Sequence, residues 1–164
     1  MTFSEWLLPE FDEEVKNTRK LLECVPDGSL DFQPHPKSMK LGRLAVHVAE
    51  LPSWTNLMLD QEVLEMTPDY KPTVVTSAAE LLKILDDSAS SARAKIAAAT
   101  DEDWAVTWTF KWAGETVLSA PRSKVMRGTI MNHLVHHRAQ LGVYLRLLDV
   151  KIPGMYGPSA DESM

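Results

Sequence analysis

Three histidines near the carboxyl-terminal end of the chain have the residue type and spacing of metal ligands. They are His133, His136 and His137, and Arg138 and Gln140 follow directly. The surrounding residues have the apolar periodicity of one long amphipathic helix. On such a helix, side chains four residues apart project from one face, so His133 and His137 could grip a single ion. Because two imidazoles are too few for a stable site, a third ligand must come from elsewhere in the chain.

A helical wheel separates the histidines that face inward from those that do not. At about 100° per residue, His137 lies within the apolar stripe of its helix, His133 lies at the edge, and His136 lies about 60° beyond that edge. On an earlier helix, His47 shares its face with apolar residues, namely Leu44, Leu51, Trp54 and Met58. We therefore expect His47, His133 and His137 to converge between two helices. Three protein ligands with one open position are typical of catalytic zinc, although neutral imidazole also suits nickel and iron.

Other interpretations of these histidines stay open at this point. A buried histidine can simply be hydrogen-bonded in a core, which would leave a metal-free helical scaffold. His136 could act as a fourth ligand and close the site, or it could be exposed. His35, between two prolines, could overhang the site or lie on a surface loop. A closed site would favour a non-catalytic metal- or ligand-binding dimer over an enzyme.

Two polar residues beside the last histidine are candidates for supporting the ligands. Gln140 lies one turn beyond His137 and could orient it, or could be a polar residue at the helix rim. Arg138 points about 100° away from His137, so we expect it to pin a carboxylate or to line a dimer contact. Glu50 lies about 60° off His47 and is expected to be a solvated helix residue rather than a general base. No catalytic residue can be assigned beyond these candidates.

The periodicity predicts an all-α fold, a four-helix bundle, in one domain spanning residues 1–164. The four helices are expected at residues 4–24, 40–65, 77–99 and 121–149, with Ser4, Ser38 and Ser77 as caps. Pro52 should kink the second helix. Residues 101–121 alternate large and small side chains with a turn at Gly114, which predicts an irregular or short hairpin-like excursion before the last helix.

Composition restricts the class of partner. The net charge of -6 argues against nucleic acid, and no apolar stretch is long enough to span a membrane. The start of the chain does not look like a secretory signal, and a single cysteine suits a reducing cytoplasm. That cysteine, Cys24, is expected to be a small buried hydrophobe. A thiol taking part in a reaction would therefore be exogenous.

Three segments together resemble the DinB-like family of small four-helix-bundle metalloproteins. They are Leu41-Gly-Arg-Leu-Ala-Val-His47 after Pro34-His35-Pro36, then His133-x-x-x-His137-Arg138-x-Gln140-Leu141, and finally Tyr144-Leu-Arg-Leu-Leu148 running into Ile152-Pro153. The similarity spans essentially the whole chain. It implies a metal site on His47, His133 and His137, commonly holding nickel or zinc, and frequent assembly as a homodimer.

The resemblance also suggests a class of activity. The wider group includes S-transferases that use low-molecular-weight thiols such as bacillithiol, and a mycothiol-dependent isomerase. Many other members are labelled metal-dependent hydrolases without a demonstrated substrate. We therefore expect a cytoplasmic, metal-dependent thiol transferase or hydrolase that acts on a small molecule.

Overall fold

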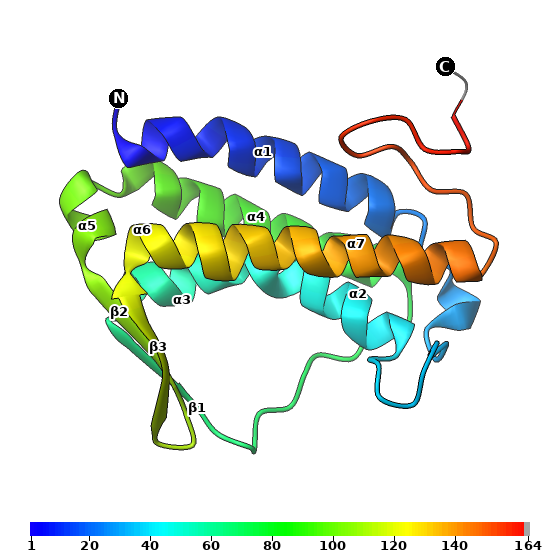
Figure 1. The fold of residues 1–164 in the computed structure, drawn as a ribbon, viewed down its shortest axis with the longest axis horizontal. Helices are drawn as coiled ribbons and strands as arrows, with labels where there is room; N and C mark the ends of the chain where they lie inside the picture. Colours follow the sequence, from blue (N-terminus) through cyan, green and yellow to red (C-terminus); the bar gives the residue numbers. More distant parts are fainter. Residues whose placement is uncertain (163–164) are drawn as a thin grey trace.

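The computed structural model describes residues 1–162 of the chain and is mostly helical, with one small sheet (Figure 1). The long helices are α1 (Phe3–Leu22), α4 (Ala78–Ala98) and α7 (Asn132–Leu147). The shorter helices are α2 (Leu41–Glu50), α3 (Trp54–Asp60), α5 (Asp101–Ala105) and α6 (Arg122–Val125). The strands are β1 (Val63–Met66), β2 (Thr107–Trp112) and β3 (Glu115–Pro121).

The first and third expected helices form nearly where the sequence places them. The side chain of Thr2 caps α1 in place of Ser4, because Thr2 and Glu5 form a reciprocal capping box. Ser4 is the second residue of α1, and its hydroxyl instead accepts a hydrogen bond from the Trp104 indole N–H at 2.8 Å. Ser77 caps α4 as predicted, accepting a hydrogen bond from the backbone of Glu80.

The predicted extent of the second helix, residues 40–65, is wrong. Lys40, not Ser38, precedes α2, and α2 ends at Glu50. Pro52 lies in a 3-10 turn, Leu51–Ser53, that leads into α3. Proline has no backbone N–H to donate, so the helical ladder is interrupted there and restarts at a changed angle. The chain leaves α3 after Asp60 and forms a strand where the sequence predicted continued helix.

The expected hairpin is confirmed, but the sheet it belongs to was missed. β2 and β3 pair in antiparallel fashion around a turn at Ala113 and Gly114, both of which have positive φ. β1 adds to β2 in parallel, with Val63 opposite Thr109. The prediction of an all-α fold is therefore wrong for these three strands. The pairing joins segments more than forty residues apart, so it leaves no local periodicity in the sequence.

The last expected helix is divided into three parts. α6 starts at Arg122, a π-helical turn covers Met126–Met131, and α7 follows to Leu147. The π turn widens the helix just before His133 without interrupting it, a common feature next to functional residues. Throughout α7 the ordinary helical register holds, which is why the wheel positions of His133 and His137 are reliable.

The helix that carries His47 packs directly against the helix that carries His133 and His137. A core of buried side chains joins α2 and α7 to α1 and α4, and includes Leu41, Leu44, Leu81, Leu134, Leu141 and Leu145. In Figure 1, α7 runs alongside α2, while α3 lies beside the π-helical turn that precedes α7. This packing fixes the spacing between the two helix faces that bear the histidines.

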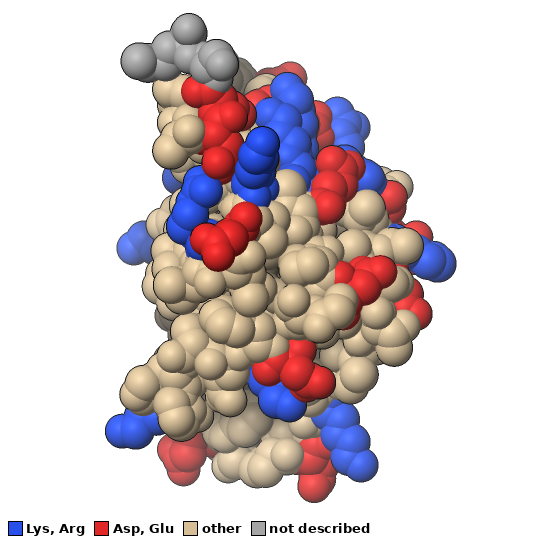
Figure 2. All heavy atoms as spheres, turned by 90° about the vertical axis from the view of Figure 1, so that its right-hand side faces the viewer, with Lys and Arg blue, Asp and Glu red and all other residues tan. Residues whose placement is uncertain are grey.

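The surface at the end of the molecule where α7 ends and α2 begins carries charges of both signs. In Figure 2, Lys and Arg side chains lie among Asp and Glu side chains, with uncharged surface between them. Neither sign forms an extended patch on this face. Within residues 1–162, none of the helices combines the length and the apolarity that a membrane crossing needs.

Candidate metal centre

The three inward histidines meet through their Nε2 atoms. The Nε2 atom of His133 lies 2.8 Å from that of His137 and 3.3 Å from that of His47. The ligand atoms of the three residues all lie within 4.8 Å of one another. Two nitrogens bound to one tetrahedral ion at about 2.0–2.1 Å are about 3.3 Å apart. The cluster therefore has the dimensions of a site that could hold a metal ion.

The hydrogen bonds of the ring nitrogens show that this cluster suits a cation. His133 Nδ1 lies 3.2 Å from the carbonyl oxygen of Thr129, which can only accept, so Nδ1 carries the proton. His137 Nδ1 donates in the same way to Oε1 of Gln140 at 2.7 Å. In the neutral rings, both Nε2 atoms then present lone pairs to each other. A shared positive ion relieves this repulsion, and imidazole donors suit several transition metals, zinc, nickel and iron among them.

Electrostatics keep the three rings neutral. Burial, and after it the charges of His137, His133 and Arg43, lower the pKa of His47 to about 3. Burial is also the main cause of the lowered pKa values of His133 and His137. Neutral imidazole is the form that coordinates a metal, so the site does not need to lose protons near neutral pH.

A polar group of three residues stands behind His47, and the sequence did not reveal it. Glu50 is largely buried, with Oε1 4.0 Å from His47 Nδ1 and 3.5 Å from Nη1 of Arg43. Tyr70 donates its hydroxyl proton to the same oxygen at 3.4 Å. Burial raises the pKa of the Glu50 carboxyl, while Arg43 and Tyr70 counteract this. The expectation that Glu50 is a solvated residue is wrong; it faces the Nδ1 side of His47, opposite the cluster.

The other candidates lie outside the cluster. His136 is exposed and stacks edge-on against His137, and among residues 1–162 only His47, His133 and His137 form a metal-sized group. His35 is exposed in the connector before α2, where its Nδ1 accepts from the backbone of Lys37. Cys24 is half-buried just after α1, and its thiol donates a hydrogen bond to the Lys20 carbonyl at 3.3 Å. None of the three supplies a ligand atom to the cluster.

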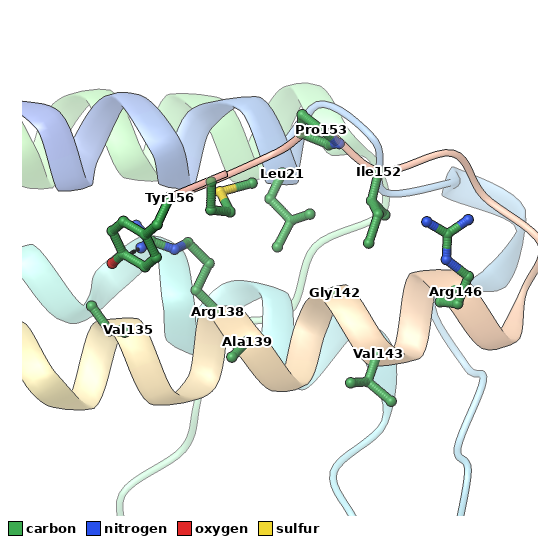
Figure 3. A pocket seen from close by; sticks show the side chains of 11 residues that line it. Leu21, Val135, Arg138, Ala139, Gly142, Val143, Arg146, Ile152, Pro153 and Tyr156 are labelled. Carbon is green, nitrogen blue, oxygen red and sulfur yellow. Dashed lines mark hydrogen bonds between the residues drawn. The ribbon is translucent and has the colours of Figure 1, made fainter. Parts of the chain in front are cut away.

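Arg138 forms an ion pair with a buried carboxylate, which is one of the two roles expected for it. It is 2% exposed, and its Nη2 lies 2.5 Å from Oε2 of Glu14 on α1. The Tyr156 hydroxyl, from the carboxyl-terminal tail, contacts both groups. Figure 3 shows Arg138 and Tyr156 at one end of an apolar groove that runs between α7 and the tail and is lined also by Leu21. Arg138 is thus turned away from the histidines and ties α7 to α1.

Comparison with known proteins places the whole chain in one family. The family model described as the DinB family matches residues 2–164. The chain belongs to the DinB family. A DinB-like protein from Bacillus cereus ATCC 10987 has a crystal structure that superposes with a TM-score of 0.74 and 27% identity, covering 93% of this chain and 97% of that one. A DinB-like protein from Bacillus subtilis gives a TM-score of 0.68 at 15% identity, over 92% and 97%, which shows a shared fold.

A relative by sequence is the uncharacterised YrdA protein of Bacillus subtilis (strain 168). It is 24% identical over 155 residues, which are 94% of this chain and 89% of YrdA. The two solved structures share the fold of this chain, and none of the three names states a reaction or a ligand. The function of this chain must therefore be argued from its own site.

Proposed function

We propose that this DinB protein is a metal-dependent enzyme that acts on a small molecule through His47, His133 and His137. The observation that carries the proposal is the convergence of three Nε2 atoms, with His133 Nε2 2.8 and 3.3 Å from its partners. A zinc or nickel ion bound there would lower the pKa of a water or a thiol near neutral pH. Three protein ligands leave a tetrahedral ion one position for that group.

The surrounding residues hold the three ligands in place. Gln140 and the carbonyl of Thr129 fix the protons of His137 and His133 on Nδ1, so both rings direct Nε2 to the same point. Glu50 lies behind His47 at 4.0 Å, within reach of its Nδ1 through one water. The carboxylate stabilises the ring from the far side instead of taking a proton from a substrate. We therefore favour thiol transfer, with an exogenous low-molecular-weight thiol, over hydrolysis.

We propose further that the enzyme is a homodimer in the cytoplasm, where small thiols are kept reduced. The side chains of Val143 and Leu147 on α7 are exposed, 60% and 58%, and would be covered by a second copy. The mass in solution, measured by analytical ultracentrifugation, tests the dimer. A monomer at high protein concentration would refute it.

A thiol-conjugation assay tests the proposed reaction. Protein loaded with zinc or nickel is mixed with 1-chloro-2,4-dinitrobenzene and, in turn, cysteine, glutathione or bacillithiol. We expect at least one thiol to react faster with the loaded protein than with the metal-free protein or with the His133→Ala variant. His136→Ala removes an exposed histidine from the same helix and should keep the rate. Equal rates for loaded and metal-free protein with every thiol would contradict thiol transfer, and an ester substrate then tests hydrolysis.

A further inference from the structure

Arg43 lies between the histidine cluster and a neighbouring cleft of about 570 Å³. It stands one turn before His47 on α2, so both side chains project from the same side of that helix. The cleft is formed by residues within 27–31, 40–43 and 72–76, which bring together the connector before α2, the start of α2 and the loop before α4. A cleft of this size accommodates a small molecule rather than a macromolecule.

Arg43 differs from the other charged residues of the cleft in lacking a full partner. Asp31 pairs with Lys40 at 2.7 Å, and Asp27 accepts a hydrogen bond from the Ala78 backbone at 2.6 Å. The Nη1 atom of Arg43 is buried and has no hydrogen-bond partner within residues 1–162. Its nearest carboxylate, Glu50, is 3.5 Å away, outside good hydrogen-bond distance. Nη1 is directed at Glu50, but the Arg43 side chain lines the cleft and is 31% exposed, so the guanidinium remains accessible to an acceptor on a ligand.

The charge of Arg43 also reaches the histidine cluster. Its Nη1 lies 3.5 Å from Oε1 of Glu50, and the same oxygen lies 4.0 Å from Nδ1 of His47. A divalent ion on the histidines would add two more positive charges beside this guanidinium, and Glu50 is the carboxylate that lies next to both Arg43 and His47. Positive groups close together in a partly buried site repel each other unless an anion joins them. The arrangement therefore attracts a negatively charged ligand.

Building on the proposed function, we infer that Arg43 binds the carboxylate of a small-molecule substrate or thiol whose reactive end reaches the histidine cluster. The planar guanidinium matches the two oxygens of a carboxylate. A doubly charged phosphate is less suitable, because Asp27 and Asp31 line the same cleft. The selected ligand is thus a carboxylic acid with a single negative charge at this end.

Binding of two matched thiols to the cobalt-loaded protein tests this inference. 3-Mercaptopropionate carries a carboxylate, whereas 2-mercaptoethanol of similar length carries a neutral hydroxyl. Isothermal titration gives the Kd of each, and thiolate-to-cobalt absorbance reports binding at the metal. A charge-assisted hydrogen bond predicts about 10- to 100-fold tighter binding of 3-mercaptopropionate by the wild-type protein.

Variants assign that preference to Arg43. Arg43→Gln should abolish this preference, measured as the ratio of the two Kd values at matched cobalt occupancy. Arg43→Lys keeps the positive charge but loses the paired N–H donors of the guanidinium, so it should retain only part of the preference. If Arg43→Gln does not fold, Arg43→Lys serves as the test variant. Arg93→Gln removes an arginine that pairs with Asp12 on a distant surface, and should bind like the wild type.

The outcomes separate this inference from the proposed function. Wild-type protein that retains no cobalt contradicts the metal-dependent function itself. Cobalt-loaded protein that binds both thiols equally, or an Arg43→Gln variant that keeps the preference, overturns the role of Arg43 and leaves the metal centre intact. Inorganic phosphate should compete with 3-mercaptopropionate less effectively than propionate does. Stronger competition by phosphate would overturn the assignment of a carboxylate.

Discussion

The Nδ1 atom of His137 lies 2.7 Å from the side-chain oxygen of Gln140, three residues further along α7. His133 has the same relationship with the backbone carbonyl of Thr129, one turn earlier. One helix therefore supplies two candidate ligands together with the acceptors that orient them. α2 has to supply only His47.

Removing the acceptor of His137 should weaken metal binding without abolishing it. In Gln140→Ala, the ring loses the partner that holds its proton on Nδ1, and we expect about 10- to 100-fold lower metal affinity. Gln140→Glu keeps an oxygen acceptor and should preserve the affinity. Competition with a chromogenic chelator measures both. An unchanged affinity in Gln140→Ala would show that Gln140 is only a polar residue at the helix rim.

Arg138 should matter for stability rather than for metal binding. Arg138→Ala leaves the buried carboxylate of Glu14 without its positive partner and with only the Tyr156 hydroxyl as a side-chain donor, which costs about 3 kcal/mol of unfolding free energy. Urea denaturation measures this loss. The double variant Glu14→Leu with Arg138→Met removes both charges and should lose less than Arg138→Ala alone. A double variant that is less stable than the single one would contradict this account.

The carboxyl-terminal tail should loosen in acid. The hydrogen bond from Arg146 and the Ile152 backbone lower the pKa of Asp161, and the backbones of Gly154 and Ser159 lower that of Glu162. A lowered pKa in the folded state means that the ionised form stabilises the fold. This contribution is complete above the ordinary pKa values of 3.8 and 4.5, and it is lost as the pH falls through the lower folded values.

Proteolysis at two pH values tests the tail. Pepsin, active in acid, should cut within residues 150–162 faster at pH 2 than at pH 4. Asp161→Asn and Glu162→Gln remove the titrating groups and should make cleavage similar at both values, after correction for the intrinsic pH dependence of pepsin on an unfolded peptide. A wild-type tail that is cut equally fast at the two values would refute the role of these carboxylates.

Helical periodicity was enough to predict the candidate ligands. A period of 3.6 residues separates inward His133 and His137 from exposed His136, and it places His47 on an apolar face of another helix. Their meeting then follows, because two apolar faces in one domain must pack against each other. The hairpin was also predictable, since strand alternation and the turn at Gly114 are local signals.

The missed features all depend on where the chain goes after a helix ends. Pro52 stops the ladder near Glu50, and the turn that follows leaves the Glu50 carboxylate beside His47 and Arg43. Tyr70 reaches Glu50 from a loop whose path no periodicity describes. β1 is defined only by its pairing with β2. Such contacts are set by tertiary packing and are not encoded in local spacing.

The metal content of protein purified without an affinity tag or added metal tests the central claim most directly. Inductively coupled plasma mass spectrometry should find about one zinc or nickel ion per chain in the wild type, on the basis of three imidazole ligands. His47→Ala should lose most of this metal although it lies 86 residues from His133 in sequence. His136→Ala should keep all of it. Full occupancy in His47→Ala, or a wild-type protein that holds no metal even after dialysis against zinc, would contradict the account.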